Sequence, residues 1–283
     1  MKRTVGIIGA GTMGGGIAQV AALAGFDVLL HDVSGDALKA SMERIKGDLR
    51  KSVQTGRATA SDATGALTRI RPRREFNDLG AADVVIEAAV EDLEVKKEIF
   101  RALDLIVAPR AILATNTSSL SITSIGSLTK TPESVVGMHF FNPPAQMKLV
   151  EIVRGSQTSD ETVRSVHEMA LAMGKTPVFC SDTPGFIVNR VARPFYGEAL
   201  RLLGEGTATA EQIDRIVRLS GGFRMGPFEL MDMIGIDVNY AVTKSVYEQF
   251  FHEPRFRPHP IQRRMVEAGT LGRKTGQGFY RYE

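Results

Sequence analysis

The chain has 283 residues, of which 43% are hydrophobic and 24% are charged, and its formal net charge is +3 at pH 7. This composition is typical of a globular protein, and the length suggests about two domains. The charge is too small for this length to indicate nucleic-acid binding. The single cysteine, Cys180, excludes an intrachain disulfide and is typical of a reducing compartment.

No apolar run reaches the length that spans a membrane. The first predicted strand begins near residue 4, which leaves no room before it for a signal or transit peptide. We therefore expect a cytoplasmic protein with neither a membrane nor a nucleic-acid partner.

The beginning of the chain combines a strand, a glycine-rich turn, a helix and a second strand. The apolar run over residues 4–8 predicts a buried parallel strand. It is followed by Gly9-Ala10-Gly11-Thr12-Met13-Gly14, a G-x-G-x-x-G sequence, and then by a helical pattern that ends at Gly25. A second strand over residues 27–31 leads to Asp32. This order indicates a dinucleotide-binding site.

Each position of the glycine motif has a physical reason. Gly9 permits a tight turn, Gly11 lets a diphosphate approach the main chain, and Gly14 lets helix and strand pack closely. The diphosphate would then lie at the positive end of the helix, where Thr12 and Met13 begin the first turn. Asp32 stands where an acid accepts the ribose hydroxyls, and residues 33–36 contain no base. We therefore expect NAD rather than NADP.

Strand and helix patterns alternate after Asp32. Residues 34 to about 67 predict a helix, a break near Gly56 and a shorter helix. Further strands are expected over 70–76, near an edge, and over 83–88, 111–116, 135–141, 149–153 and 177–179, with a helix over 93–107. The last strand would bury the thiol of Cys180. The pattern predicts an α/β fold, a Rossmann-type doubly wound sheet with a helical-hairpin insertion.

Ligands of such sheets bind at the carboxyl ends of the strands. Four polar residues lie at or just beyond predicted strand ends: Glu91, Lys96, Asn116 and Ser118.

The pattern becomes helical after the segment 182–185. Helices are expected over 186–203, 210–219 and 228–251. We therefore predict two domains, a Rossmann domain over 1–183 and an all-α C-terminal domain over 184–283.

A histidine and a glutamate are predicted to face each other across two strands. A hairpin centred on Ala145 puts Glu151 directly opposite His139, with Cβ atoms roughly 5 Å apart. A lone histidine in an apolar strand is more often structural, but a carboxylate on one ring nitrogen orients the ring and stabilises the imidazolium. The other nitrogen can then accept a proton. Next to a nicotinamide site, this pair would oxidise an alcohol.

The chain resembles the 3-hydroxyacyl-CoA dehydrogenase family, including the bacterial 3-hydroxybutyryl-CoA dehydrogenases, over essentially its whole length. The resemblance rests on several motifs in order: the glycine motif, Ile86-Glu87-Ala88-Ala89-Val90-Glu91, Asn116-Thr117-Ser118-Ser119, His139-Phe140-Phe141-Asn142-Pro143-Pro144, Pro184-Gly185-Phe186-Ile187-Val188-Asn189-Arg190, Gly226-Pro227-Phe228-Glu229-Leu230-Met231-Asp232, and Gly272-Arg273-Lys274-Thr275-Gly276-Gln277-Gly278-Phe279-Tyr280.

The resemblance implies NAD-dependent, reversible oxidation of an (S)-3-hydroxyacyl-CoA of short chain, with no metal. It implies that His139 and Glu151 are the catalytic pair, that Ser118 and Asn189 bond the reacting oxygen or the thioester carbonyl, and that Asn142 supports the site. Glu91 and Lys96 match the cofactor-contacting pair of the family. Taken alone, Ser118 could be a helix N-cap, Asn142 the start of a turn, Asn189 an ordinary helix residue, and Lys96 a surface lysine.

A basic stripe follows one face of the predicted helix after Asp32. It contains Lys39, Lys46, Arg50 and Arg57. Such a stripe indicates either a solvated helix face or a binding site for a phosphate-rich ligand. Because the helical insertion of the family binds CoA, the resemblance makes Lys46, Arg50 and Lys51 candidate CoA contacts. It also implies that the C-terminal domain closes over the acyl chain and forms a homodimer.

Three other readings remain. A β-hydroxyacid dehydrogenase of free acids would use a lysine on the first helix of the C-terminal domain, and residues 186–203 contain none. A structural protein built on this fold is disfavoured by the intact His139, Glu151 and Ser118. An NAD-sensing transcription factor would need a DNA-reading module, and the first predicted strand begins at about residue 4, which leaves no space for one.

Overall fold

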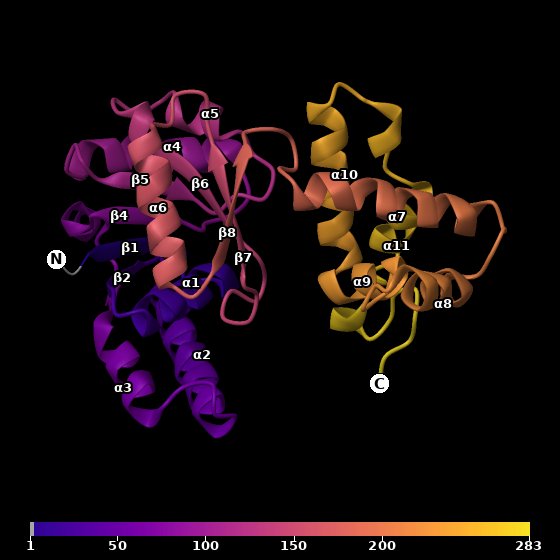
Figure 1. Ribbon diagram of the computed structural model, residues 1–283, viewed down its shortest axis with the longest axis horizontal. Helices are drawn as coiled ribbons and strands as arrows, with labels where there is room; N and C mark the ends of the chain where they lie inside the picture. The colour runs from indigo at the N-terminus through magenta and orange to yellow at the C-terminus, as the bar shows by residue number, and fades with distance from the viewer. Residues whose placement is uncertain (1–2) are drawn as a thin grey trace. The chain divides into compact units, whose positions relative to one another are not determined.

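The computed structural model describes residues 3–283. The chain divides into two units at the bond between Thr183 and Pro184. The first unit is built on a sheet and the second on helices (Figure 1).

Within residues 3–283, eight strands form one sheet in the order β3-β2-β1-β4-β5-β6-β7-β8. All neighbours pair in parallel except β6 and β7, which are antiparallel. The order turns back at β1, which confirms the predicted doubly wound sheet. The strands are β1 (Thr4–Ile8), β2 (Asp27–His31), β3 (Ile70–Arg73), β4 (Val84–Glu87), β5 (Ile112–Thr115), β6 (Val135–Phe140), β7 (Leu149–Arg154) and β8 (Thr176–Ser181).

Helices cover both faces of the sheet, which is why its central strands are continuously apolar. Helices α1 (Thr12–Leu23) and α6 (Asp160–Ala172) pack on one face and share a core with Val5 and Ile7 of β1. Helices α4 (Leu93–Ile106) and α5 (Ile122–Gly126) lie on the opposite face from α6 (Figure 1). The carboxyl ends of the parallel strands therefore stay open for a ligand.

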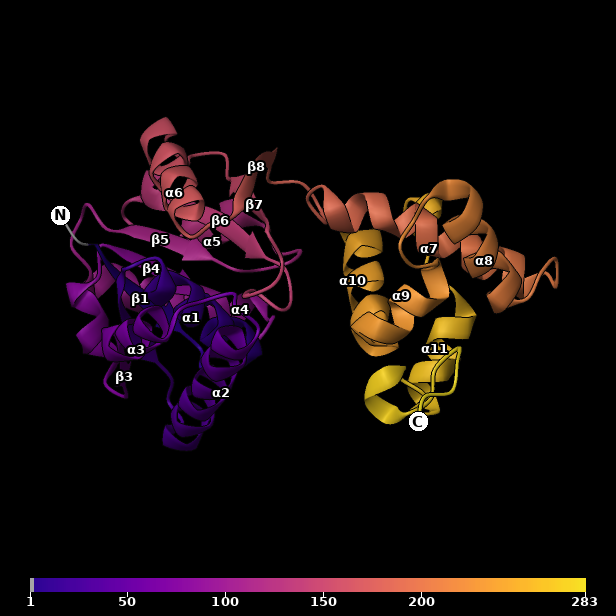
Figure 2. The same cartoon turned by 60° about the horizontal axis from the view of Figure 1, so that its bottom comes forward.

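The helical hairpin projects beyond the sheet (Figures 1 and 2). Its helices are α2 (Gly35–Gln54) and α3 (Ala60–Arg69), capped by the side chains of Ser34 and Thr59. Leu38, Ile45 and Leu49 bury one face of α2. The break near Gly56 is confirmed, and α2 already ends at Gln54. Arg57 therefore does not belong to the helical stripe in which the wheel placed it.

The strands β3 and β8 both overlap segments that were predicted to be strands. The edge position of β3 is confirmed, because it pairs only with β2. The strand around Cys180 is also confirmed, as β8, but the thiol is only half-buried. Burial, followed by the charges of Glu151 and Asp182, raises the pKa of the Cys180 thiol to about 12. The thiol is therefore protonated, and unreactive, near neutral pH.

The second unit consists mainly of α7 (Val188–Gly204), α8 (Ala210–Gly221), α9 (Pro227–Ile234), α10 (Ile236–Gln249) and α11 (Pro260–Glu267). Helix α9 packs against α7, α8 and α10 (Figure 2). The prediction of a single helix over 228–251 is wrong. Gly235, at φ 102°, interrupts it and separates α9 from α10, because this conformation is incompatible with a continuous helix.

Buried acids anchor the end of the chain to this helical unit. Asp232 accepts hydrogen bonds from the amides of Phe279 and Tyr280 and from the hydroxyl of Tyr282. Asp214 accepts from the amides of α9 and from the hydroxyl of Tyr280. Each of these carboxylates is thus compensated by donors in place of a cation.

Candidate active site

The glycine turn between β1 and α1 is sterically closed to larger residues. Gly9 has φ 95°, and its amide donates to the carbonyl of His31 at 2.9 Å. A Cβ on Gly14 would lie 1.8 Å from the carbonyl oxygen of Gly9, so α1 approaches the turn as closely as glycine allows. A Cβ on Gly11, in contrast, would meet no protein atom within 4 Å. The open side of the turn is therefore at Gly11, beside Thr12 and Met13 in the first turn of α1.

Asp32 follows β2 directly and ties the two loops at this edge together. One carboxylate oxygen accepts from the amide of Ala10 at 2.7 Å, and the other from the amide of Ser34 at 2.9 Å. Arg44 on α2, for which no role was predicted, donates to the carbonyl of Ala10 at 2.9 Å. Arg44 thus places a positive charge beside the glycine turn, and a lone arginine in a helix gives no sequence signal for such a contact.

A charged cluster lies at the ends of β4 and β5. Lys96 is 1% exposed, so it is not a surface lysine, and its ammonium donates to Glu87 at 2.6 Å. Glu87 is fully buried and also accepts from the hydroxyl of Thr115. The ammonium lies 3.5 Å from Glu91 as well. Glu87 was not among the predicted site residues, although an acid at the end of an apolar strand is a signal for such a position.

Glu91 connects this cluster to the loop after β5. It accepts hydrogen bonds from the hydroxyl of Thr117 and from the amide and hydroxyl of Ser118, at 2.7, 2.7 and 3.0 Å. Asn116 in the same loop accepts from the amide of Phe140 at 2.8 Å, which joins the loop to the end of β6. The structure therefore brings together the four polar residues that were predicted at the strand ends.

The predicted register of the hairpin is confirmed. His139 of β6 pairs directly with Glu151 of β7, and the two side chains are 6% and 1% exposed. The Nδ1 atom of His139 lies 2.7 Å from a carboxylate oxygen of Glu151. A buried carboxylate this close can hold the ring in one orientation and stabilise a positive charge on it. Nε2 is then the ring nitrogen that can exchange a proton with a ligand.

The remaining predicted residues lie in three places. Asn142 is exposed in the connection that follows β6, and Asn189 is in the first turn of α7 in the second unit. Lys46, Arg50 and Lys51 are exposed on α2. Lys46 forms a surface ion pair with Glu43 at 3.0 Å.

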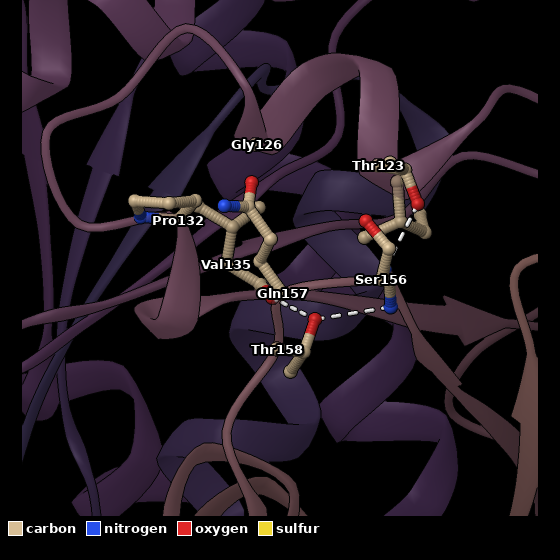
Figure 3. A pocket seen from close by; sticks show the side chains of 9 residues that line it. Thr123, Gly126, Pro132, Val135, Ser156, Gln157 and Thr158 are labelled. Atoms are coloured by element: carbon tan, nitrogen blue, oxygen red, sulfur yellow. Dashed lines mark hydrogen bonds between the residues drawn. The ribbon is translucent and has the colours of Figure 1, made fainter.

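A small hollow occurs elsewhere in the first unit (Figure 3). It lies between α5, the start of β6 and the turn after β7, where Thr123 accepts from the amide of Ser156 and Thr158 donates to the carbonyl of Val135. Its volume is about 10 Å³, about the size of one water molecule. It is at the opposite end of β6 from His139 and has no part in the site.

A doubly wound sheet with a glycine turn and an acid after β2 defines the class of dinucleotide-binding proteins. Sequence comparison specifies the family. Residues 4–183 match the sequence model of the 3-hydroxyacyl-CoA dehydrogenase NAD binding domain, and residues 185–282 match that of the C-terminal domain. The chain therefore belongs to the 3-hydroxyacyl-CoA dehydrogenase family, and it is an oxidoreductase that uses NAD.

Individual relatives agree with this assignment. The chain is 51% identical over 98% of its length to the 3-hydroxyadipyl-CoA dehydrogenase of Escherichia coli K12, of which it spans 58%. It is 46% identical to a probable 3-hydroxybutyryl-CoA dehydrogenase of Deinococcus radiodurans, covering 98% of this chain and 99% of the relative. A crystal structure of (S)-3-hydroxybutyryl-CoA dehydrogenase from Ralstonia eutropha is 43% identical, with full coverage of both chains and a TM-score of 0.95.

The turn, α1 and Asp32 fit the cofactor. The open side at Gly11 admits a diphosphate, and the first helix of this turn has no side-chain cap to compete for its amides. When bound, NAD supplies the hydride acceptor.

We expect a strong preference for NADH over NADPH, on the order of 10²-fold or more in kcat/KM, because a 2′-phosphate would face the carboxylate of Asp32. Steady-state kinetics with both cofactors measure this ratio. Asp32→Asn should lower it, whereas Asp36→Asn, an exposed acid in the first turn of α2, should not. Equal efficiency with the two cofactors in the unaltered protein would contradict the role of Asp32.

Proposed function

We propose that the chain catalyses the reversible NAD-dependent oxidation of short-chain (S)-3-hydroxyacyl-CoA thioesters, such as 3-hydroxybutyryl-CoA, to 3-oxoacyl-CoA. The observation that carries the proposal is the buried contact of 2.7 Å between His139 and Glu151 at the open edge of the sheet. The names of the relatives from Deinococcus radiodurans and Ralstonia eutropha support the substrate.

In this reaction Nε2 of His139 takes the proton of the 3-hydroxyl group while the hydrogen on the same carbon leaves as hydride. The carbon–oxygen bond becomes a carbonyl. Glu151 stabilises the imidazolium that forms, and the reverse reaction returns the proton to the carbonyl oxygen. Because both side chains are buried, their interaction is little weakened by solvent.

Further polar residues of both units are proposed to orient the substrate and the cofactor. Ser118 and Asn189 hydrogen-bond the reacting oxygen or the thioester carbonyl, and Asn142 supports this arrangement. Glu91 and Lys96 contact the ribose of the nicotinamide, together with Asn116 and Ser118 in the loop after β5. Glu87 holds the ammonium of Lys96 in place for that contact.

The basic residues of α2 bind the CoA part of the substrate. Lys46, Arg50 and Lys51 are exposed on a helix that projects from the sheet, where a flexible nucleotide can reach them. The ion pair of Lys46 with Glu43 is exposed on both sides and is weak enough to be exchanged for a phosphate.

A second candidate substrate comes from the Escherichia coli relative, whose name specifies 3-hydroxyadipyl-CoA. Its acyl chain ends in a carboxylate. The observation that favours it is a buried arginine in the second unit, Arg193, which forms no ion pair with any acid among the described residues.

The protein is proposed to be a cytoplasmic homodimer that assembles through its helical unit. Ile216 and Leu219 on α8, and Phe223 just after it, are 62%, 73% and 53% exposed. Ile216 and Leu219 are three residues apart and therefore lie on one face of α8, and Phe223 follows four residues later. Such a row of exposed apolar side chains indicates an interaction surface. No helix in the described part of the chain is long and apolar enough to cross a membrane.

His139→Gln should lower kcat by on the order of 10²–10⁴-fold, because it removes the base. Glu151→Gln should cost a comparable factor while leaving NADH binding intact, because the histidine loses its orienting acceptor and its counter-charge. The double variant should be little worse than either single one. Single-turnover kinetics and NADH titration measure both quantities, and independent, multiplicative losses would refute the joint action of the pair.

Replacing both Lys46 and Arg50 by alanine should raise the KM for acetoacetyl-CoA by about 5–30-fold, through the loss of two phosphate contacts. The KM for a truncated pantetheine thioester should stay unchanged. The matched control is the double alanine variant of Arg101 and Lys130, which removes two exposed charges of the same sign elsewhere in the first unit. A similar rise for both substrates would mean that α2 presents a solvated face.

Replacing both Ile216 and Leu219 by glutamate should convert a dimer into a monomer, because it puts charge into the proposed apolar interface. Analytical ultracentrifugation reads out the change. The same substitution of Leu105 and Leu171, which are 75% and 52% exposed in the first unit, should leave the dimer intact. A monomeric unaltered protein would refute the homodimer, and a variant that stays dimeric would exclude this face.

A further inference from the structure

Arg193 is an unusual charge in the helical unit. Its side chain is 4% exposed, and its guanidinium donates to the carbonyls of Asn189 and Asn239 and to the hydroxyl of Thr243, at 3.0, 2.9 and 2.8 Å. All these acceptors are neutral. Within residues 3–283, no carboxylate lies within ion-pair distance of this guanidinium. Arg201 on the same helix, in contrast, pairs with Glu198 at the surface.

A buried cation without a counter-ion costs free energy, because it gives up water and gains no opposite charge. The ring of Tyr196, whose centroid lies 5.1 Å from the guanidinium carbon of Arg193, offsets only part of this cost. Burial lowers the pKa of Arg193 to about 10, so the side chain stays charged at neutral pH. The sequence thus retains a destabilising positive charge at a position where an apolar residue could fill the space.

The hydrogen-bonding capacity around Arg193 is also incomplete. Two of its nitrogens are used by good acceptors, but Nη2 faces the carboxamide oxygen of Asn189 only at 3.5 Å, beyond the normal range. Asn239, whose main-chain carbonyl Arg193 contacts, is 1% exposed, and its Nδ2 is a buried donor that has no hydrogen-bond partner among residues 3–283. Arg193 thus contacts a residue whose own side chain holds an unsatisfied donor, and a carboxylate is the kind of group that accepts from both a guanidinium and an amide.

The position of Arg193 relates this charge to the acyl chain. Asn189 and Arg193 are four residues apart on α7 and so share one helix face, about 6 Å apart along the helix axis. Asn189 is the residue proposed to bond the reacting end of the substrate. A carboxylate carbon three bonds beyond the carbon that bears the hydroxyl lies about 3.8 Å from it in an extended chain. The two separations differ by about 2 Å, which is less than the length of an arginine side chain.

We propose that Arg193, with Asn239 beside it, binds the distal carboxylate of a 3-hydroxyacyl-CoA whose acyl chain ends in an acid. The inference rests on the proposed function and names the substrate class of that same site. Arg193 is then a specificity-determining residue, and an uncharged acyl end would leave its charge uncompensated.

The test compares two CoA esters of equal chain length, 3-hydroxyadipyl-CoA and 3-hydroxyhexanoyl-CoA, which differ in a terminal carboxylate. The unaltered protein should have a kcat/KM higher by on the order of 10–100-fold for the dicarboxylate. Arg193→Met should reduce this ratio to about one. Arg201→Met, which removes an exposed and paired charge from the same helix, should keep it.

Asn239→Asp provides a second variant of nearly unchanged shape, should Arg193→Met fail to fold. It puts a carboxylate on the residue whose main-chain carbonyl Arg193 contacts, so it should abolish the preference for the dicarboxylate and raise the Tm. If the unaltered protein oxidises both esters equally well, or if Arg193→Met lowers kcat for both alike, the carboxylate site is wrong and Arg193 only positions Asn189. If the protein oxidises neither these esters nor 3-hydroxybutyryl-CoA, the proposed function itself fails.

Discussion

The antiparallel pairing of β6 with β7 is the constraint on which the site depends. Every other pair in the sheet is parallel. The carboxyl ends of β1 to β6 therefore lie at one edge of the sheet. The reversal lets the body of β7 lie opposite the end of β6 and puts Glu151 across from His139. Because side chains alternate between faces, a slip of one residue would turn Glu151 away from the ring.

Buried charged side chains are compensated in different ways in different parts of the molecule. Glu87 and Lys96 neutralise each other beneath the open edge of the sheet. Asp214 and Asp232 are satisfied by amides and tyrosine hydroxyls, and they lock the end of the chain onto the helical unit. Arg193 has neither arrangement. Lys175 is also buried, and its ammonium donates to the main-chain carbonyls of Pro144 and Met147 rather than to an acid. What distinguishes Arg193 is that the residue it contacts, Asn239, also carries an unsatisfied buried donor, and this combination is a reason to look for a ligand.

The two loops at the open edge of the sheet are held by acids rather than by apolar packing. Asp32 bonds the glycine turn to the start of α2, and Glu91 bonds its own loop to the segment that contains Ser118. Such bonds orient main-chain amides and hydroxyls before a ligand arrives. They also explain why polar residues cluster at the ends of strands that are otherwise apolar.

Local patterns in the sequence were sufficient for much of this protein. The glycine motif and Asp32 predicted the cofactor turn, since a tight turn and a close approach depend on neighbouring residues. The hairpin register followed from a short connection, which leaves few ways to pair 135–141 with 149–153. The alternation of strands and helices predicted the doubly wound sheet and the change to helices near Pro184.

Only the tertiary structure revealed the residues whose partners are distant in the chain. Gly235 looks tolerable in a helical pattern, and its φ of 102° arises because α9 and α10 must turn to pack. Lys96 reads as a surface residue until α4 packs and brings it to Glu87. Arg44 and Arg193 are ordinary helix residues by pattern, and their meaning depends on Ala10 and Asn239, 34 and 46 residues away. Burial and charge compensation are properties of three-dimensional packing, which periodicity along the chain does not encode.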